Sequence, residues 1–268
     1  MPMSEFDADP THTAEENLLA EWWRETKVAA VFLTRLPLGL EAAGPTAIGE
    51  AARGFPTVGA AIGAGAALVY GVATSLDLPQ AVAAVLAVGA MVLATGALHE
   101  DGLADMADGF GAGHGREDIL AIMHDSRIGA YGVLALMLVI GLRILCVAEL
   151  HGSFTAALAL IAAASGSRAV LPIVLHYLPP ARSDGLGHDA GRPGRRMLID
   201  CAAVGAALAL IGLGPFGGLL ALLVTGLAAW MIANLALKRI GGQTGDVLGT
   251  IQQAGEVAIL LTAVATQP

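Results

Sequence analysis

Long apolar stretches alternate with shorter polar segments along most of the chain. Six stretches are long enough to cross a bilayer as helices, since about 20 apolar residues span the hydrocarbon core. They are predicted at residues 57–76, 79–98, 128–148, 154–175, 198–214 and 217–237. A seventh stretch, 257–266, is short for a full crossing, and a re-entrant or half-buried segment is the alternative. The pattern predicts an all-α, polytopic membrane protein, a bundle of about six to seven transmembrane helices with polar loops.

Composition supports this reading. Of the 268 residues, 56% are hydrophobic and 14% charged, whereas soluble domains carry roughly a quarter charged residues. A net charge of −9 argues against nucleic acid as a partner. The two cysteines lie in apolar stretches and form neither a disulfide framework nor a metal-ligand spacing. Without an internal repeat, residues 1–268 are expected to form a single domain, in which 1–27 is an acidic N-terminal extension that includes the start of an interfacial helix.

The basic residues predict the orientation of the chain. Apart from Arg143 and Arg168, which fall inside predicted spans, every Lys and Arg lies in four segments: 1–56, 99–127, 176–197 and 238–256. Positively charged loops face the cytoplasm, so these segments are expected there. Residues 15–33 place Leu and Trp at helical spacing among charges, which predicts an interfacial amphipathic helix or a cytosolic helix packed on the loops. Residues 1–25 lack the features of a secretory leader, so insertion is expected to depend on the internal spans.

One acidic segment follows the second predicted span. Asp101, Asp105 and Asp108 have the spacing that places three carboxylates on one face of a helix. The chain has no Lys or Arg between residues 53 and 116, so nothing local neutralises them. Oxygen ligands of this kind suit Mg²⁺ or Mn²⁺, which share their coordination with substrate phosphates. A metal site is therefore predicted, with a solvated acidic helix as the alternative.

Other polar residues on the same side are candidates for substrate binding. Arg127 is a candidate for phosphate and Asp125 for an additional metal ligand, although a mutual Asp–Arg pair is the favoured alternative. Asp246 lies in a glycine-rich segment that lacks the lysine of a Walker A loop. Arg168 is expected to face a polar cavity or to extend toward the interface. The arginines of the 182–196 loop are expected to attract an anionic substrate or lipid headgroups.

Six segments together resemble the adenosylcobinamide-GDP ribazoletransferase, or cobalamin synthase, family. They occur in the expected order between about residues 28 and 260. They are residues 32–37 (FLTRLP), 54–59 (GFPTVG), 99–109 (HEDGLADMADG), 122–129 (IMHDSRIG), 167–168 (SR) and 242–249 (GQTGDVLG). Many members carry a bulky apolar residue where this chain has Glu100, so Glu100 is an additional carboxylate.

The resemblance implies an enzyme of the bacterial inner membrane that acts late in cobalamin synthesis. It would join α-ribazole or its 5′-phosphate to adenosylcobinamide-GDP and release GMP, with Mg²⁺ as cofactor and the lipid bilayer as its environment. The metal would be held by Asp101, Asp105 and Asp108. Asp105, Asp108 or His99 would act in catalysis. The implied substrate-binding residues are Arg35, Asp125, Arg127, Arg168 and Asp246.

Two alternatives stay open, one within enzymes and one from a different class. One is a phosphatidyltransferase of the CDP-alcohol type, since enzymes of that type have an aspartate-rich helix similar to the one predicted here. The other is a divalent-cation or small-solute transporter, although transporters place ionisable groups near the bilayer midplane rather than in loops. The sequence leaves open the preferred form of ribazole, the choice between one and two metal ions, and whether the chain forms a homo-oligomer.

Overall fold

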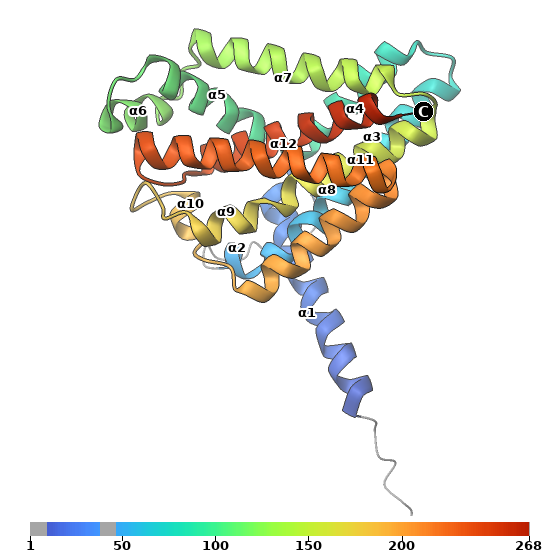
Figure 1. Ribbon diagram of the computed structural model, residues 1–268, viewed down its shortest axis with the longest axis horizontal. Coiled ribbons are helices and arrows are strands. Elements are labelled where there is room, and N and C mark those ends of the chain that lie inside the picture. The colour runs from blue at the N-terminus through green and yellow to red at the C-terminus, as the bar shows by residue number, and fades with distance from the viewer. Residues whose placement is uncertain (1–9, 38–46, 268) are drawn as a thin grey trace, which may run out of the picture.

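The computed structural model describes residues 10–37 and 47–267, and this part of the chain is almost entirely helical. Within these ranges the one β-type pairing is an isolated bridge between Pro180 and Gln243. Figure 1 shows the arrangement of the helices. In chain order they are α1 (Pro10–Leu33), α2 (Ala47–Glu50), the 3-10 turn η1 (Ala52–Gly54), α3 (Phe55–Ser75), α4 (Gln80–Thr95), α5 (Leu98–Ala112), α6 (Arg116–Met123), α7 (Ala130–Glu149), α8 (Ser153–Ala169), α9 (Leu171–Tyr177), α10 (Leu186–Asp189), α11 (Arg195–Ile240) and α12 (Gly245–Thr266).

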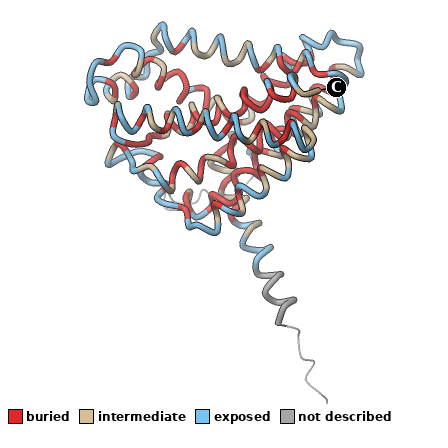
Figure 2. The backbone as a smooth tube through the Cα atoms, in the orientation of Figure 1, coloured by how far each residue is buried: buried red, intermediate tan, exposed pale blue. Residues whose placement is uncertain are grey.

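The helices form one bundle around α3, α8 and α12. Close packing of α3 on α8 depends on Gly59 and Gly63, where a Cβ atom would meet backbone atoms of α8. Among the described residues, five helical segments are long and apolar enough to cross a membrane, or six if the bent α4–α5 pair counts as one span. The predicted fold class, an all-α polytopic membrane protein, is confirmed. Figure 2 shows buried residues along the central helices and many exposed ones along α7.

α11 consists of two antiparallel arms. The chain reverses at Gly214, whose φ of 72° is easily adopted only by glycine, and Pro215 follows. The arms then pack so closely that a Cβ atom on Gly218 would lie 2.7 Å from the Cα atom of Leu210. The predicted break between spans 198–214 and 217–237 is thus confirmed.

The predicted span at 79–98 is wrong at its C-terminal end. α4 ends at Thr95, and the next two residues, Gly96 and Ala97, have left-handed backbone angles, with φ of 63° and 58°. The chain bends there by 89° before α5 begins at Leu98. Hydropathy alone missed the bend because the apolar run continues through it. As a result, the acidic residues of α5 lie on a helix that is nearly perpendicular to α4.

The prediction for residues 257–266 also needs correction. This stretch is the second half of α12, a helix of 22 residues that begins at Gly245, where the Thr244 side chain accepts a hydrogen bond from the backbone N–H of Val247. The apolar run looked short because Gln252, Gln253 and Glu256 interrupt it, yet these side chains are buried against polar partners. Residues 245–256 are therefore helix rather than loop, and α12 is long and apolar enough to cross the membrane.

The polar segments gather at one end of the bundle. α5, α6, α10 and the turn between α11 and α12 lie together there, on the left in Figure 1. At the opposite end, the Thr74 and Ser153 hydroxyls are 3.0 Å apart, and the Gln267 side chain donates to the Glu149 carbonyl at 3.0 Å. The bundle thus brings distant polar segments of the sequence to one end.

α1 extends away from the bundle in Figure 1. Its C-terminal half packs on α3, where Trp22 Nε1 donates to the Thr57 hydroxyl at 3.3 Å, while Trp23 and Leu19 remain exposed. The predicted helix at 15–33 is confirmed as a helix, and its interfacial location stays a prediction. The part of the acidic extension before Pro10 lies outside the described residues.

Candidate functional site

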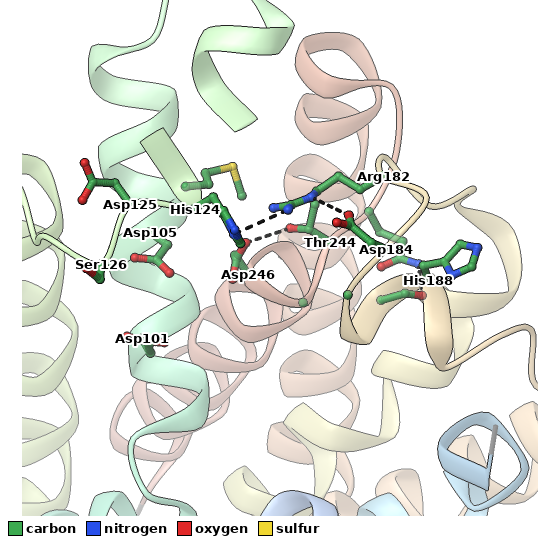
Figure 3. Close-up of a pocket in the computed structure, with 15 residues that line it drawn as sticks. Asp101, Asp105, His124, Asp125, Ser126, Arg182, Asp184, His188, Thr244 and Asp246 are labelled. Carbon is green, nitrogen blue, oxygen red and sulfur yellow. Dashed lines mark hydrogen bonds and ion pairs between the residues drawn. The ribbon is translucent and has the colours of Figure 1, made fainter. Parts of the chain in front are cut away.

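A water-accessible pocket of about 430 Å³ opens at the polar end of the bundle. Five aspartates line it, and three of them come from two packed helices: Asp101 and Asp105 from α5, and Asp246 from the first turn of α12. Figure 3 shows these three side chains around the pocket. Their helices pack closely, because a Cβ atom on Gly102 would lie 2.9 Å from the Cα atom of Asp246. Glycine at this position is what brings the two acidic segments together.

The three carboxylates lack a strong positive neighbour. Asp105 lies on α5, outside the membrane-spanning segments, and its pKa is raised to about 7 by burial and then by the charges of Asp101, Asp246 and Asp108. The nearest basic group on the rim is Arg182, whose Nε donates to Asp184 at 3.1 Å and whose guanidinium is 3.4 Å from His124 Nδ1. The pocket therefore has an excess of negative charge, which favours a cation.

Asp108 does not line this pocket. Its carboxylate is buried and accepts hydrogen bonds from the backbone N–H groups of Gly129, at 2.7 Å, and Gly132, at 2.9 Å. It therefore satisfies free amides at the N-terminus of α7. The spacing argument correctly predicted a helix for Asp101, Asp105 and Asp108, but the structure separates the third carboxylate from the other two.

Asp125 and Arg127 pair with each other. The guanidinium of Arg127 donates to both carboxylate oxygens of Asp125, at distances of 2.6–3.2 Å, and this pairing lowers the pKa of Asp125 to about 2. Asp125 lines the pocket rim, whereas the Arg127 side chain is 87% exposed. The alternative of a mutual pair is therefore the arrangement that the structure shows.

Three other predicted site residues lie away from the acidic pocket. Arg168 is buried, donates to the Ala164 carbonyl at 2.9 Å and lies 3.9 Å from Glu256. Arg35 packs on Gly96 at the α4–α5 bend, where its backbone N–H donates to the Ala94 carbonyl. His99 is buried and lines a separate, apolar cavity.

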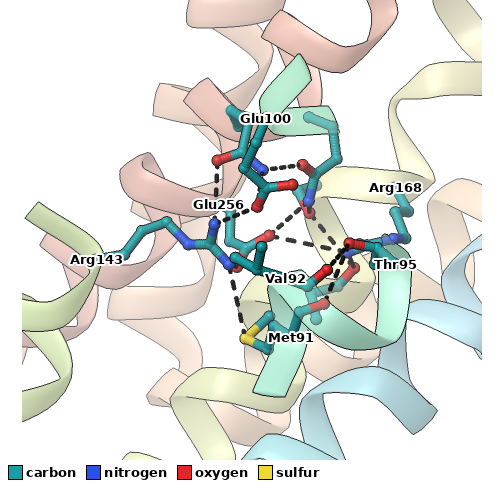
Figure 4. Close-up of polar contacts among 11 residues, drawn as sticks. Met91, Val92, Thr95, Glu100, Arg143, Arg168 and Glu256 are labelled. Atoms are coloured by element: carbon teal, nitrogen blue, oxygen red, sulfur yellow. Dashed lines mark hydrogen bonds and ion pairs between the residues drawn. The ribbon is translucent and has the colours of Figure 1, made fainter. Parts of the chain in front are cut away.

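Next to the pocket, but facing the interior, lies a buried network of charged and amide side chains (Figure 4). Arg143 donates to Glu100 and contacts Glu256, each at 2.7 Å, and Arg168 approaches Glu256 from the other side. Gln253 donates to Glu100 at 3.1 Å. Two carboxylates therefore face two guanidiniums, and all four side chains are buried. Glu100, whose role the sequence left open, belongs to this network and not to the pocket.

Several lining residues had no assigned role in the sequence analysis. They are Ser126, Asp184, His188, Gln243 and Thr244. Gln243 links the loop before α12 to the arginine-rich loop, because its backbone N–H and C=O pair with Pro179 and Ala181 at 2.8 Å. The glycine-rich segment around Gln243 was visible in the sequence. Its pairing with Pro179 and Ala181 was not, because these residues are more than 60 positions away in the chain.

The lining residues fit a hard divalent cation. Their donors are carboxylate oxygens, with hydroxyl and carbonyl oxygens nearby, as Mg²⁺ prefers. In the part of the chain that the structure describes, no group of three or more Asp, Glu, His or Cys side chains is placed to hold a metal ion by itself. Mg²⁺ usually takes one or two protein carboxylates and completes its shell with water and substrate phosphates. Asp101, Asp105 and Asp246 are the residues that could hold it.

The bundle defines a polytopic membrane protein with an acidic pocket at one end of its helices. Comparison with known families then specifies the class. Residues 25–264 match the model of the cobalamin-5-phosphate synthase family. The chain belongs to this family.

Curated relatives cover nearly the whole chain. A protein from Bradyrhizobium diazoefficiens is 46% identical over 91% of this chain and 94% of its own length. One from Azorhizobium caulinodans is 48% identical over 86% of this chain and 91% of its own, and one from Mesorhizobium japonicum is 45% identical over 89% and 92%. Each is named adenosylcobinamide-GDP ribazoletransferase, and the present chain is likewise a transferase. No solved structure gives a significant match.

Proposed function

We propose that this chain transfers α-ribazole, or its 5′-phosphate, onto adenosylcobinamide-GDP. A free ribose hydroxyl of ribazole, other than the 5′-oxygen that is esterified in ribazole 5′-phosphate, forms a new bond through its oxygen to the phosphorus that carries cobinamide. The bond between that phosphorus and the oxygen bridging to GMP breaks. The products are a cobalamin, or its 5′-phosphate, together with GMP and the proton released by the attacking hydroxyl.

The open acidic pocket is the observation that carries this proposal. A diphosphate brings negative charge, so it can approach Asp101, Asp105 and Asp246 only together with a cation. When bound, Mg²⁺ would neutralise the diphosphate and the developing charge on GMP. Arg182, on the rim, is placed to bind a phosphate oxygen in addition.

The proton of the attacking hydroxyl requires an acceptor in the same pocket. Asp105 is suited to this role where Asp101 and Asp246 hold the cation, because it lines the pocket and its pKa without a metal is about 7. Asp108 is less suited, since both of its oxygens are engaged by backbone amides. His99 is buried beside the apolar cavity and does not line the acidic pocket.

The same proposal places the pocket at the cytoplasmic face of a bacterial inner membrane. Several basic residues lie at the polar end of the bundle, where the pocket opens: Arg116, Arg182 and Arg239. Positively charged segments favour the cytoplasmic side. The family assignment favours ribazole transfer over the two alternatives, a CDP-alcohol phosphatidyltransferase and a transporter.

A reconstituted assay tests the proposal. Purified protein in nanodiscs is given adenosylcobinamide-GDP, α-ribazole and Mg²⁺, and GMP is measured. We expect GMP to form, to stop after chelation and to return when Mg²⁺ is added back. Absence of GMP with both forms of ribazole, or release unaffected by chelation, would contradict the proposal.

A further inference from the structure

A second cavity, of about 130 Å³, adjoins the acidic pocket and shares Asp101, Gly245 and Asp246 with it. Its remaining wall is largely apolar and comes from several helices. The apolar side chains that line it are Phe32, Leu33, Ile48, Phe55, Leu98, Leu171, Leu175 and Leu248, together with Ala190. An apolar cavity open to a charged pocket suits a ligand with one apolar end and one polar end.

Two sequence motifs that the acidic pocket leaves unexplained meet in this cavity. Phe32 begins the segment 32–37, and Phe55 lies in the segment 54–59. Their rings stack with centroids 6.2 Å apart and an interplanar angle of 21°. Both contribute to the wall, so the cavity presents aromatic as well as aliphatic surface to a ligand.

One buried polar group on the wall lacks a protein partner. His99 is 4% exposed, and among the described residues nothing forms a hydrogen bond with its Nδ1 atom. Leaving such a group unsatisfied is unfavourable, and native structures mostly avoid it. A ligand with one hydrogen-bonding ring atom would satisfy it.

We infer that this cavity binds the base of the ribazole nucleoside, and this inference rests on the proposed function. The base is a methylated benzimidazole, an apolar bicycle with one ring nitrogen free to accept a hydrogen bond from His99 Nδ1–H. The ribose then lies at the boundary marked by Asp101 and Asp246, and its attacking hydroxyl reaches the acidic pocket.

Direct binding tests the location of the base without turnover. α-Ribazole is titrated calorimetrically into the nanodisc-embedded protein, in the absence of metal and of adenosylcobinamide-GDP. Leu175→Trp fills the cavity, and we expect its Kd for α-ribazole to rise at least tenfold. Leu138→Trp is the matched control, because Leu138 is exposed on α7, and its Kd should equal that of the wild type.

Steady-state kinetics separates this site from the other substrate. For Leu175→Trp, the KM for α-ribazole should rise at least tenfold while the KM for adenosylcobinamide-GDP stays unchanged. A folded Leu175→Trp variant with wild-type α-ribazole binding would overturn the inference, as would a rise confined to the KM for adenosylcobinamide-GDP. If the wild type forms no GMP, the proposed function fails, whereas the binding titration still decides where the nucleoside binds.

The role of His99 has its own test. An analogue of α-ribazole with carbon in place of the free ring nitrogen cannot accept a hydrogen bond. The wild type should bind it roughly five- to tenfold more weakly than α-ribazole, as expected for one lost hydrogen bond. His99→Ala should bind the two compounds equally. Equal binding by the wild type, or full discrimination by His99→Ala, would contradict the assignment.

Discussion

Glu100 and Asp101 are adjacent in the chain, yet their side chains lie in opposite electrostatic surroundings. Glu100 faces the interior, where Arg143 contacts it at 2.7 Å in a network with two carboxylates and two guanidiniums. Asp101 faces an open pocket that four further aspartates and a single arginine, Arg182, also line. The structure therefore holds a balanced set of charges and an unbalanced set on two faces of the same helix.

The comparison shows how this fold tolerates its acidic residues. In an apolar interior an unpaired charge is strongly unfavourable, so the network has to be neutral to exist at all. In the pocket, water reaches the carboxylates, and their repulsion can persist until a cation arrives. The buried network therefore stabilises the packing of α5, and the proposed function assigns the chemistry to the pocket.

The largest expected effect is on stability, and it comes from removing one charge of the buried Glu–Arg network. Arg143→Leu leaves Glu100 and Glu256 buried with Arg168 as the remaining base, 3.9 Å from Glu256. Removing one partner of a buried pair typically costs about 3–5 kcal/mol of folding free energy. We expect a large fall in Tm in detergent. Adding Glu100→Gln restores the balance of charge and should recover part of the loss, and a double variant no more stable than Arg143→Leu would argue against charge balance.

A second substitution removes one of the unpaired negative charges of the acidic pocket. Asp105→Asn removes a carboxylate from the pocket and should lower kcat about a thousandfold, or ~4 kcal/mol of barrier, because metal stabilisation of the diphosphate weakens. Its Tm should stay at or above that of the wild type, since mutual repulsion is relieved. GMP release measures the first effect and thermal denaturation the second.

The control is Glu117→Gln, an exposed acid on α6 that lies outside both cavities. It removes the same charge near the same end of the bundle, so it should leave kcat unchanged. Equal losses in Asp105→Asn and Glu117→Gln would mean that general electrostatics, rather than the pocket, controls activity.

Asp108 is a third case, since its buried carboxylate is neither paired with a guanidinium, as Glu100 is, nor open to the pocket, as Asp101 is. It accepts hydrogen bonds from backbone amides instead. Asp108→Ala should lower stability by about 1–3 kcal/mol, the cost of leaving buried donors without partners. Gly132→Ala should also destabilise the protein, since its Cβ atom would collide with the Asp108 carboxylate.

The matched control for Gly132→Ala is Gly141→Ala in the same helix, where no described atom lies within 4 Å of the added Cβ. An Asp108→Ala variant with wild-type Tm and lost metal binding would instead support the metal role predicted from sequence.

The smallest effect is expected at Asp125. Its pair with Arg127 is exposed, so Asp125→Asn should leave the Tm unchanged. The pKa of Asp125 is depressed to about 2 in the folded chain, so any contribution to stability is present above pH 4 and is lost only as the pH falls toward 2. A clear change in Tm between pH 5 and 8 that disappears in Asp125→Asn would contradict this assignment.

Much of the fold was predictable because the bilayer imposes simple length and polarity rules. The reversal at Gly214 was visible as glycine and proline in a long apolar run. The bend after α4 was not visible, since Gly96 and Ala97 sit inside an apolar stretch and only their backbone angles show it. α12 was underestimated because its polar residues are buried in contacts with α5, α7 and α8.

The site was predictable in part. Helical spacing correctly placed Asp101, Asp105 and Asp108 on one helix, but spacing cannot show which carboxylate meets a pocket and which meets an amide. The partners that decide this, Gly129 and Asp246, are distant in sequence. Only the folded chain brings them together.

Binding of Mn²⁺, followed by electron paramagnetic resonance on the nanodisc-embedded protein, tests the central claim most directly. The account predicts that the wild type and Glu117→Gln bind the ion, in the presence of adenosylcobinamide-GDP, with equal affinity. Asp105→Asn should bind it at least tenfold more weakly. Equal affinity in all three proteins would contradict the claim that the unbalanced aspartates of the pocket hold the metal.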